Sequence, residues 1–224
     1  MVQVGAGGLG SEIGHGLVRK GIGHLTIVDN DTVDVTNLPR QFFGAEDVGQ
    51  DKALALARNL ARHATARTLI EGHAQAFQDA IRPNGSRPAA VDGDVAVVGV
   101  DNQDARIAAA EYYLTRGTPV VFLAVDVTAS CGYVYVQTSR PDDPCFLCLY
   151  PDATQDHRTF ACAGASIEIL KIVAGIALYA IDSLLMDRPR PWNYKEVFLD
   201  QRGDGAYSIA QRPGCALCNG RGDG

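Results

Sequence analysis

A short apolar run followed directly by closely spaced glycines restricts the fold of this chain more than any other feature. Val2 to Val4 lead into Gly5, Gly7, Gly8 and Gly10, and residues 11–20 have the composition of a helix. Glycine lets the backbone approach phosphate oxygens, and the following helix presents unpaired N–H groups and the positive end of its dipole. A strand, a glycine-rich turn and a helix in this order predict the first βα unit of a nucleotide-binding, Rossmann-like sheet.

The rest of the chain alternates between apolar runs and segments with helical spacing. We expect further strands over residues 25–28, 67–70, 95–100 and 120–125, and helices over residues 52–63, 104–116 and 167–186. Strands that are apolar on both faces and alternate with helices indicate a parallel, doubly wound sheet. Residues 131–138, 193–199 and 206–210 indicate later strands, the first of them antiparallel. The prediction is a single α/β domain over residues 1–224, with a mainly parallel Rossmann-like sheet and antiparallel C-terminal strands.

Charge and hydropathy exclude two classes of partner. The 224 residues carry a net charge of −6 and contain no basic run, which disfavours a nucleic-acid surface. The most apolar predicted helix contains an uninterrupted apolar run from Ile172 to Ile181, about half of the roughly 20 residues that cross a bilayer. The first residues lack the charged and apolar regions of a signal peptide. We therefore expect a cytoplasmic protein that binds neither nucleic acid nor membrane.

The glycine pattern alone does not identify the nucleotide. A G-x-G-x-x-G turn most often binds NAD or FAD. Asp29 lies 19 residues after Gly10, close to the place of the acidic residue that binds the ribose in such proteins. A nicotinamide-dependent oxidoreductase therefore fits this part of the chain.

Positive charges farther along the chain favour ATP. Its triphosphate carries about four negative charges, and attack on the α-phosphate leaves pyrophosphate whose charge must be neutralised. Arg40 can bind phosphate through two parallel bonds, and Lys52, at the start of a predicted helix, supplies a point charge. Asp101 follows the strand over residues 95–100, at the sheet edge where ligands bind, and suits a Mg²⁺ ion that bridges phosphates. The alternative is that these residues are ordinary surface charges.

Two C-x-x-C pairs near the end of the chain predict a structural metal site. Each pair follows a turn residue, Pro144 or Gly214, and four thiolates satisfy the closed tetrahedral site of structural zinc. The 66 residues between the pairs favour a staple that ties the end of the chain to its body over a nucleic-acid finger. A redox role would need a C-x-x-C beside a thioredoxin-like βαβ unit, which neither pair has. The predicted zinc ligands are Cys145, Cys148, Cys215 and Cys218.

The two remaining cysteines differ in their surroundings. Cys131 lies in an apolar strand, where we expect a buried and inert thiol. Cys162 lies just before the helix that starts near Ser166, and a helix N-terminus lowers the pKa of a thiol and makes it a better nucleophile. The alternative for Cys162 is a small core residue.

These motifs together resemble the ThiF/MoeB/E1 superfamily, the enzymes that activate ubiquitin-like and sulfur-carrier proteins. The shared pattern comprises GAGGLGS, DxD, NLxRQ, GxxK, DN and both cysteine pairs, and it covers nearly the whole chain. The resemblance implies that Asp29 binds the ribose of ATP, Arg40 and Lys52 the triphosphate, and Asp101 the Mg²⁺. The full set of ATP-binding positions is Gly5, Gly7, Gly8, Gly10, Ser11, Asp29, Asp31, Asn37, Arg40, Gln41, Lys52, Asp101 and Asn102.

The resemblance also implies a reaction and partners. The C-terminal glycine carboxylate of the carrier would attack the α-phosphate and give an acyl-adenylate and pyrophosphate. In members that continue, a cysteine near Cys162 takes the acyl group or sulfur, so an E2-type partner or a sulfur donor is implied, as is a homodimer or heterodimer. Family members usually carry a helical segment before the first strand, and this chain starts almost inside that strand. This difference leaves open a non-catalytic partner subunit of a heterodimeric activator. Related enzymes adenylate short peptides, so adenylation of a peptide is a second alternative.

Overall fold

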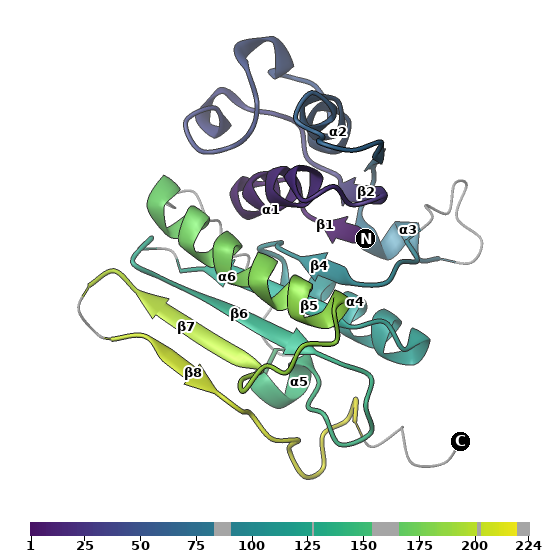
Figure 1. Ribbon diagram of the computed structural model, residues 1–224, viewed down its shortest axis with the longest axis vertical. Coiled ribbons are helices and arrows are strands. Elements are labelled where there is room, and N and C mark those ends of the chain that lie inside the picture. The colour runs from purple at the N-terminus through teal and green to yellow at the C-terminus, as the bar shows by residue number, and fades with distance from the viewer. Residues whose placement is uncertain (83–90, 127, 154–165, 201–202, 219–224) are drawn as a thin grey trace.

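A single eight-stranded sheet organises the molecule in the computed structural model, which describes residues 1–82, 91–126, 128–153, 166–200 and 203–218 (Figure 1). Its strands lie in the order β3-β2-β1-β4-β5-β6-β7-β8. Their bounds are β1 Val2–Val4, β2 His24–Asp29, β3 Leu69–Ala74, β4 Ala96–Val98, β5 Val120–Val125, β6 Cys131–Gln137, β7 Tyr194–Phe198 and β8 Gly205–Tyr207.

The direction of the strands confirms the predicted architecture. Neighbouring strands from β3 to β5 pair in parallel, whereas β6, β7 and β8 continue the sheet in antiparallel pairs. The strand order reverses at β1, where Val4 is the register partner of both Val28 in β2 and Val98 in β4. The three strands therefore end at one edge of the sheet, at the switch point where open α/β sheets bind ligands.

Helices cover both faces of this sheet. Figure 1 shows α1 and α6 in front of the sheet and α4 and α5 behind it. The helices are α1 Gly8–Arg19, α2 Lys52–Ala61, α3 Phe77–Ala80, α4 Gln103–Arg116, α5 Phe146–Leu149 and α6 Ile167–Leu185, with short 3-10 turns at Val35–Asn37 and Ala45–Asp47. Apolar side chains of α1, α2 and α6 pack together in one buried cluster, and those of α3, α4 and α5 in a second.

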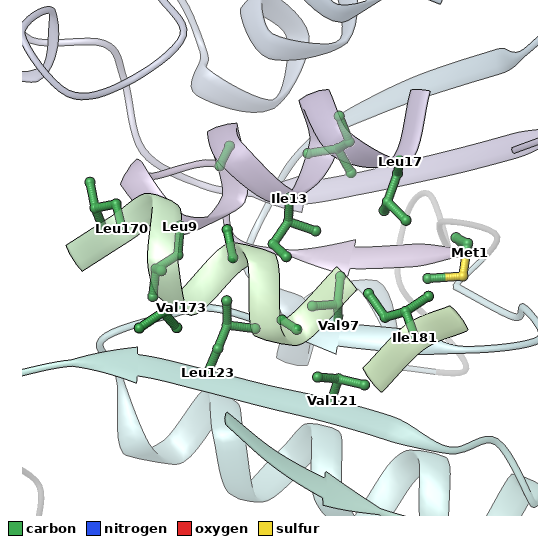
Figure 2. Close-up of a cluster of buried hydrophobic side chains, with 14 of the residues drawn as sticks. Met1, Leu9, Ile13, Leu17, Val97, Val121, Leu123, Leu170, Val173 and Ile181 are labelled. Carbon is green, nitrogen blue, oxygen red and sulfur yellow. The ribbon is translucent and has the colours of Figure 1, made fainter. Parts of the chain in front are cut away.

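The contact between α1 and α6 fixes the helix that follows the glycine turn. Figure 2 shows Leu9 and Ile13 of α1 gathered with Val173 of α6 in one buried cluster above the sheet. Two ion pairs add to this contact at the surface, Lys171–Glu12 at 3.0 Å and Lys20–Asp182 at 2.5 Å. Because the N-terminus of α1 is the predicted phosphate site, the apolar packing holds the site in place, whereas the surface ion pairs contribute little.

The elements differ from the prediction mainly at their ends. The strand predicted over residues 67–70 is β3, which begins at Leu69 and runs to Ala74. It is an edge strand, and its polar residues Glu71 and His73 interrupt the apolar run, so the C-terminal part of the strand was not predicted. The helices α3 and α5 were not predicted, because four-residue helices are too short to show a helical period. None of the helices in the described residues is long and apolar enough to cross a membrane.

Candidate functional site

The glycine turn folds tightly at the carboxyl end of β1. Gly5 adopts a φ of +105°, which favours glycine, and a Cβ there would lie 2.7 Å from the carbonyl oxygen of Gly99. A Cβ on Gly10 would lie 2.2 Å from the carbonyl oxygen of Gly5, so only glycine permits this approach. Gly7, by contrast, faces open space and precedes α1 without a side-chain cap. The turn therefore leaves the first N–H groups of α1 accessible to an anion.

Asp29 closes the turn from the end of β2. Its Oδ2 accepts a bond of 2.6 Å from the N–H of Ala6, and its Oδ1 accepts one of 2.8 Å from the N–H of Asp31. Burial raises the pKa of Asp29 above its ordinary value even though both of these bonds lower it. The carboxylate therefore lies against the glycine turn, where the sequence predicted an acidic residue for the ribose.

Lys52 and Asp31 form an ion pair beside Asp29. Lys52 is the first residue of α2, and its Nζ donates to Oδ2 of Asp31 at 2.8 Å. The side chain of Lys52 is 11% exposed and that of Asp31 61%. A nearly buried ammonium group is thus held at the site by a carboxylate that itself faces solvent.

The loop over residues 30–51, which we call the crossover loop, carries three further predicted residues. Asn37 is buried, and its carbonyl oxygen accepts bonds from the N–H groups of Arg40 at 3.2 Å and Gln41 at 3.0 Å. The guanidinium of Arg40 donates to the carbonyl oxygen of Thr36 at 2.8 Å. The side-chain oxygen of Gln41 is buried and has no hydrogen-bond partner among the described residues.

Ser11 brings the crossover loop onto α1. Its hydroxyl oxygen accepts a bond of 3.0 Å from the N–H of Phe42, and a Cβ on Gly8 would lie 3.6 Å from the carbonyl oxygen of Arg40. The predicted ATP-binding residues of the glycine turn and of the crossover loop are therefore neighbours. The hydroxyl of Ser11 is occupied in holding them together.

A buried carboxylate that the sequence analysis missed anchors the crossover loop to α2. Asp47 is fully buried and accepts bonds from the N–H of Gly44 at 2.9 Å, from Asn59 Nδ2 at 2.7 Å and from the guanidinium of Arg58. Burial alone would raise the pKa of Asp47, but these three bonds outweigh it and the pKa lies below its ordinary value. No motif marks Asp47 in the sequence, because its partners come together only in the fold.

Asp101 and Asn102 follow β4 at the same edge. Asp101 is half-buried, and Asn102 caps α4 with its side-chain oxygen, which accepts a bond of 3.1 Å from the N–H of Ala105. Arg106, also missed from the sequence, is buried and donates from Nε to the carbonyl oxygen of Val100 at 2.9 Å. The segment that carries Asp101 is thus fixed from both sides. This segment lies close to the glycine turn, because Gly99, two residues before Asp101, packs against Gly5.

All four cysteines of the C-x-x-C pairs come together, as predicted. Their sulfur atoms lie within 4.8 Å of one another and all four residues are buried. The Sγ atoms of Cys145 and Cys148 are 3.9 Å apart, and those of Cys145 and Cys215, and of Cys148 and Cys218, are 3.5 Å apart. Zinc–sulfur bonds of about 2.3 Å in a tetrahedron place sulfur atoms about 3.8 Å apart. The cluster therefore fits a tetrahedral metal ion in both ligand type and spacing.

Neighbouring residues hold the first pair in place. Tyr135 donates from its hydroxyl to the carbonyl oxygens of Pro144 at 2.8 Å and Cys145 at 3.1 Å. Gln137 accepts a bond of 2.8 Å from the N–H of Phe146. Because Tyr135 and Gln137 belong to β6, the cluster is attached to the antiparallel part of the sheet.

The predictions for the two other cysteines, Cys131 and Cys162, fared differently. Cys131 is half-buried at the start of β6, so the prediction of a buried thiol was wrong. The register places Cys131 opposite Phe198 at the end of β7, and the residues of β6 are buried without interruption only farther along the strand, from Val134 to Gln137. Cys162 lies outside the described residues, and its role stays a prediction.

The comparison with family models decides what kind of protein this geometry belongs to. The model of the ThiF family matches residues 1–204. The chain belongs to the ThiF family. Two curated relatives align with 97% of the chain. The sulfur carrier protein adenylyltransferase of Thermus thermophilus is 25% identical, with 81% of its length covered, and the molybdopterin-synthase adenylyltransferase of Salmonella typhimurium is 28% identical, with 86% covered.

These relatives bear out the resemblance that the motifs indicated, and they make the chain an E1-like adenylyltransferase. Among solved structures, Escherichia coli MccB, crystallised with AMPCPP and MccA, has the same fold with a TM-score of 0.78 and 17% identity. That match covers 97% of this chain and 65% of MccB, so this chain spans less than two thirds of that protein. The ThiF match contains all of the predicted ATP-binding residues and the first cysteine pair, whereas Cys215 and Cys218 lie beyond it.

Proposed function

We propose that this ThiF-family chain binds ATP with Mg²⁺ and adenylates the C-terminal glycine carboxylate of a sulfur-carrier or ubiquitin-like protein. The observation that carries this proposal is what meets at one edge of the sheet: an uncapped helix N-terminus, the ammonium group of Lys52 at the start of α2, and the acidic end of a strand. The names of the Thermus and Salmonella relatives supply the reaction class and the class of carrier.

The residues divide the work by their chemistry. The N–H groups at the start of α1 cradle phosphate oxygens, and Asp29 accepts bonds from the ribose hydroxyls. Lys52 neutralises the departing pyrophosphate, whose greater negative charge competes with Asp31 for the ammonium group. Arg40, on the loop above Gly8, binds the same phosphates through its guanidinium.

Mg²⁺ fits the acidic side of this site. Carboxylate oxygens are the ligands it prefers, and Asp101 provides one beside the glycine turn. When bound, the ion would offset the charge of the phosphates and polarise them toward attack. Asn102, whose oxygen caps α4, supports Asp101 through the backbone.

We further propose that the four cysteines hold Zn²⁺ as a structural staple. Their burial and tetrahedral spacing support a closed site without an open position for substrate. The ion would join α5 to the segment after β8 and close a long loop.

After adenylation, we propose that the thiolate of Cys162 attacks the acyl-adenylate, forms a thioester with the carrier and releases AMP, and that an E2-type protein then takes the acyl group. In the alternative, Cys162 first accepts a sulfane sulfur from the persulfide of a sulfur donor, whose thiol is released, and the resulting persulfide attacks the acyl-adenylate and releases AMP. We propose that the protein acts as a cytoplasmic dimer.

Pyrophosphate exchange with ATP tests the adenylation step. We expect the purified chain to catalyse exchange only when a carrier ending in glycine is present, and Lys52→Ala and Asp101→Ala to abolish it. Lys171→Ala is the matched control, because Lys171 is an exposed lysine paired with Glu12 outside the site. Exchange that survives Lys52→Ala and Asp101→Ala would refute the assigned roles. Exchange that needs only a short peptide would shift the proposal to a peptide substrate.

The thiol step has its own test. If Cys162 accepts the acyl group, Cys162→Ser keeps pyrophosphate exchange and loses the covalent carrier adduct that thiols release. An unchanged adduct in Cys162→Ser would remove Cys162 from the proposal and leave the adenylation step intact.

A further inference from the structure

A glutamine stands where the central strand of the sheet would be expected to carry an apolar residue. Gln3 is the middle residue of β1 and is 1% exposed. Its register partners are Ile27 in β2 and Val97 in β4, both buried in the apolar cluster beneath α1. Figure 2 shows Val97 in that layer. The side-chain amide of Gln3 therefore lies among apolar groups, directly under the helix that starts at the glycine turn.

The amide bridges the two ends of the glycine turn. Its nitrogen donates to the carbonyl oxygen of Gly5 at 2.9 Å and to that of Gly10 at 3.0 Å. Both neighbours are acceptors, so the nitrogen and not the oxygen must face them. The amide fits under α1 because Gly14 has no side chain: a Cβ there would lie 3.1 Å from the side-chain oxygen of Gln3.

One peptide unit of the turn is consequently held from both sides. Gln3 binds the carbonyl oxygen of Gly5, and Asp29 accepts the N–H of Ala6, the other half of the same peptide group. A rotation of this peptide would break both bonds together. Gln3 therefore fixes the direction of the turn and, through the Gly5–Ala6 peptide, also the carboxylate of Asp29.

Burying an amide in this layer carries a penalty that an apolar residue would avoid. The side-chain oxygen of Gln3 is buried and has no hydrogen-bond partner among the described residues. A methionine of similar length would fill the same space without the unpaired side-chain oxygen, but it would take away the bond to the carbonyl oxygen of Gly5. What glutamine adds at this position is the pair of bonds to the glycine turn.

We propose that Gln3 is a positioning residue that clamps the phosphate-binding turn and aligns Asp29 for the ribose. The proposal rests on the proposed function, because it assumes that this turn receives the phosphates of ATP. It adds a residue that neither the motifs nor the glycine pattern includes. Gln3 acts through the backbone of the turn and does not itself touch the nucleotide.

Two measurements on Gln3→Met test the clamp. Loss of two hydrogen bonds of ordinary strength predicts a rise of roughly tenfold in the Kd for ATP·Mg²⁺, measured by titration calorimetry. The amide of Ala6 should exchange its hydrogen faster in the variant without any nucleotide. The preference for ATP over 2′-deoxyATP should fall as well, because Asp29 loses its fixed position.

Val97→Ala is the matched control, since Val97 is the register partner of Gln3 and makes no contact with the turn through a polar atom. It should lower the melting temperature, because it leaves a small cavity in the core, and keep the Kd for ATP within about twofold of the wild type, because it removes no hydrogen bond from the turn. A Gln3→Met protein with wild-type Kd and wild-type exchange at Ala6 would overturn the proposal. An equal weakening of ATP binding in Val97→Ala would overturn it too.

Gln3→Glu keeps the proposal testable if the methionine variant does not fold. Burial raises the pKa of a carboxyl group, and its protonated form can donate one bond to the turn. We expect ATP binding by this variant to strengthen toward the wild-type level as the pH falls, while wild-type binding shows no such gain. If the Kd for ATP changed with pH in the same way in Gln3→Glu and in the wild type, the clamp would be contradicted. If the wild type bound no ATP, the proposed function would fail, and exchange at Ala6 would still decide the role of Gln3.

Discussion

Replacing Asp47 with asparagine tests how the crossover loop is held against α2. Asp47→Asn keeps the shape of the side chain but removes its charge and turns one acceptor into a donor that faces Arg58 or Asn59. Hydrogen bonds to charged groups contribute about 1.5–3 kcal/mol each, and one such bond is lost outright. The ion pair adds little, because Arg58 is 46% exposed. We therefore expect unfolding to become easier by about 2–3 kcal/mol.

For a domain of this size, 1 kcal/mol shifts the melting temperature by about 2–4 °C, so Asp47→Asn should melt roughly 5–10 °C lower. Differential scanning calorimetry at neutral pH measures this shift. Asp79→Asn is the control, because Asp79 forms a solvent-exposed pair with Arg82 and should change the melting temperature by less than about 2 °C. Equal shifts in the two variants would refute the anchoring role of Asp47.

The pH dependence of this difference has a defined sign. The pKa of Asp47 in the folded protein lies below its ordinary value of 3.8, so the unfolded chain takes up the proton first as the pH falls. The contribution of Asp47 is therefore complete above about pH 4 and is lost as the pH falls through its folded pKa. The gap between wild type and Asp47→Asn should narrow in acid. A gap that widens below pH 4 would contradict the lowered pKa.

Four further substitutions test the nucleotide and metal sites. Cys145→Ser should bind less than half an equivalent of zinc by atomic absorption and melt at a lower temperature, because it removes one of four ligands; full zinc occupancy would contradict the site. Gly10→Ala should lower the melting temperature, since its Cβ would lie 2.2 Å from a backbone oxygen, whereas Gly7→Ala should fold normally and weaken ATP binding at the open face of the turn; equal melting temperatures would contradict this contrast. Lys52→Met should raise the Kd for ATP and leave folding intact, and an unchanged Kd would place Lys52 outside the phosphate site.

Local patterns predicted the fold because the central strands are buried on both faces. The run at β5, from Val120 to Val125, is apolar throughout and matches its predicted bounds. The edge strand β3 does not match its predicted bounds, because one side of it is unpaired and its polar residues interrupt the apolar run. The helix α5 depends on tertiary contacts, since Phe146 is held by Gln137 of β6.

Candidate site residues could be predicted where the side-chain type itself indicates a ligand, as a thiolate indicates a metal ion. The spacing of the four cysteines predicted the cluster that the structure shows, whereas the binding of a polyanion by Lys52 and Arg40 stays a prediction. Gln3 and Asp47 act on backbone groups that only the fold brings near them, so no spacing rule finds them. A polar residue in the centre of a buried strand was the one available signal for Gln3.

The most direct test of adenylation is to trap the activated C-terminal carboxylate of the carrier. A candidate carrier is incubated with the purified chain, ATP and Mg²⁺, hydroxylamine is added to trap the activated carboxylate, and the intact mass of the carrier is recorded. The account predicts a hydroxamate at the C-terminal glycine, formed only with ATP and absent when that glycine is deleted or Lys52 is replaced by alanine. An unmodified carrier in the presence of a folded chain that binds ATP would contradict adenylation and favour a non-catalytic partner subunit.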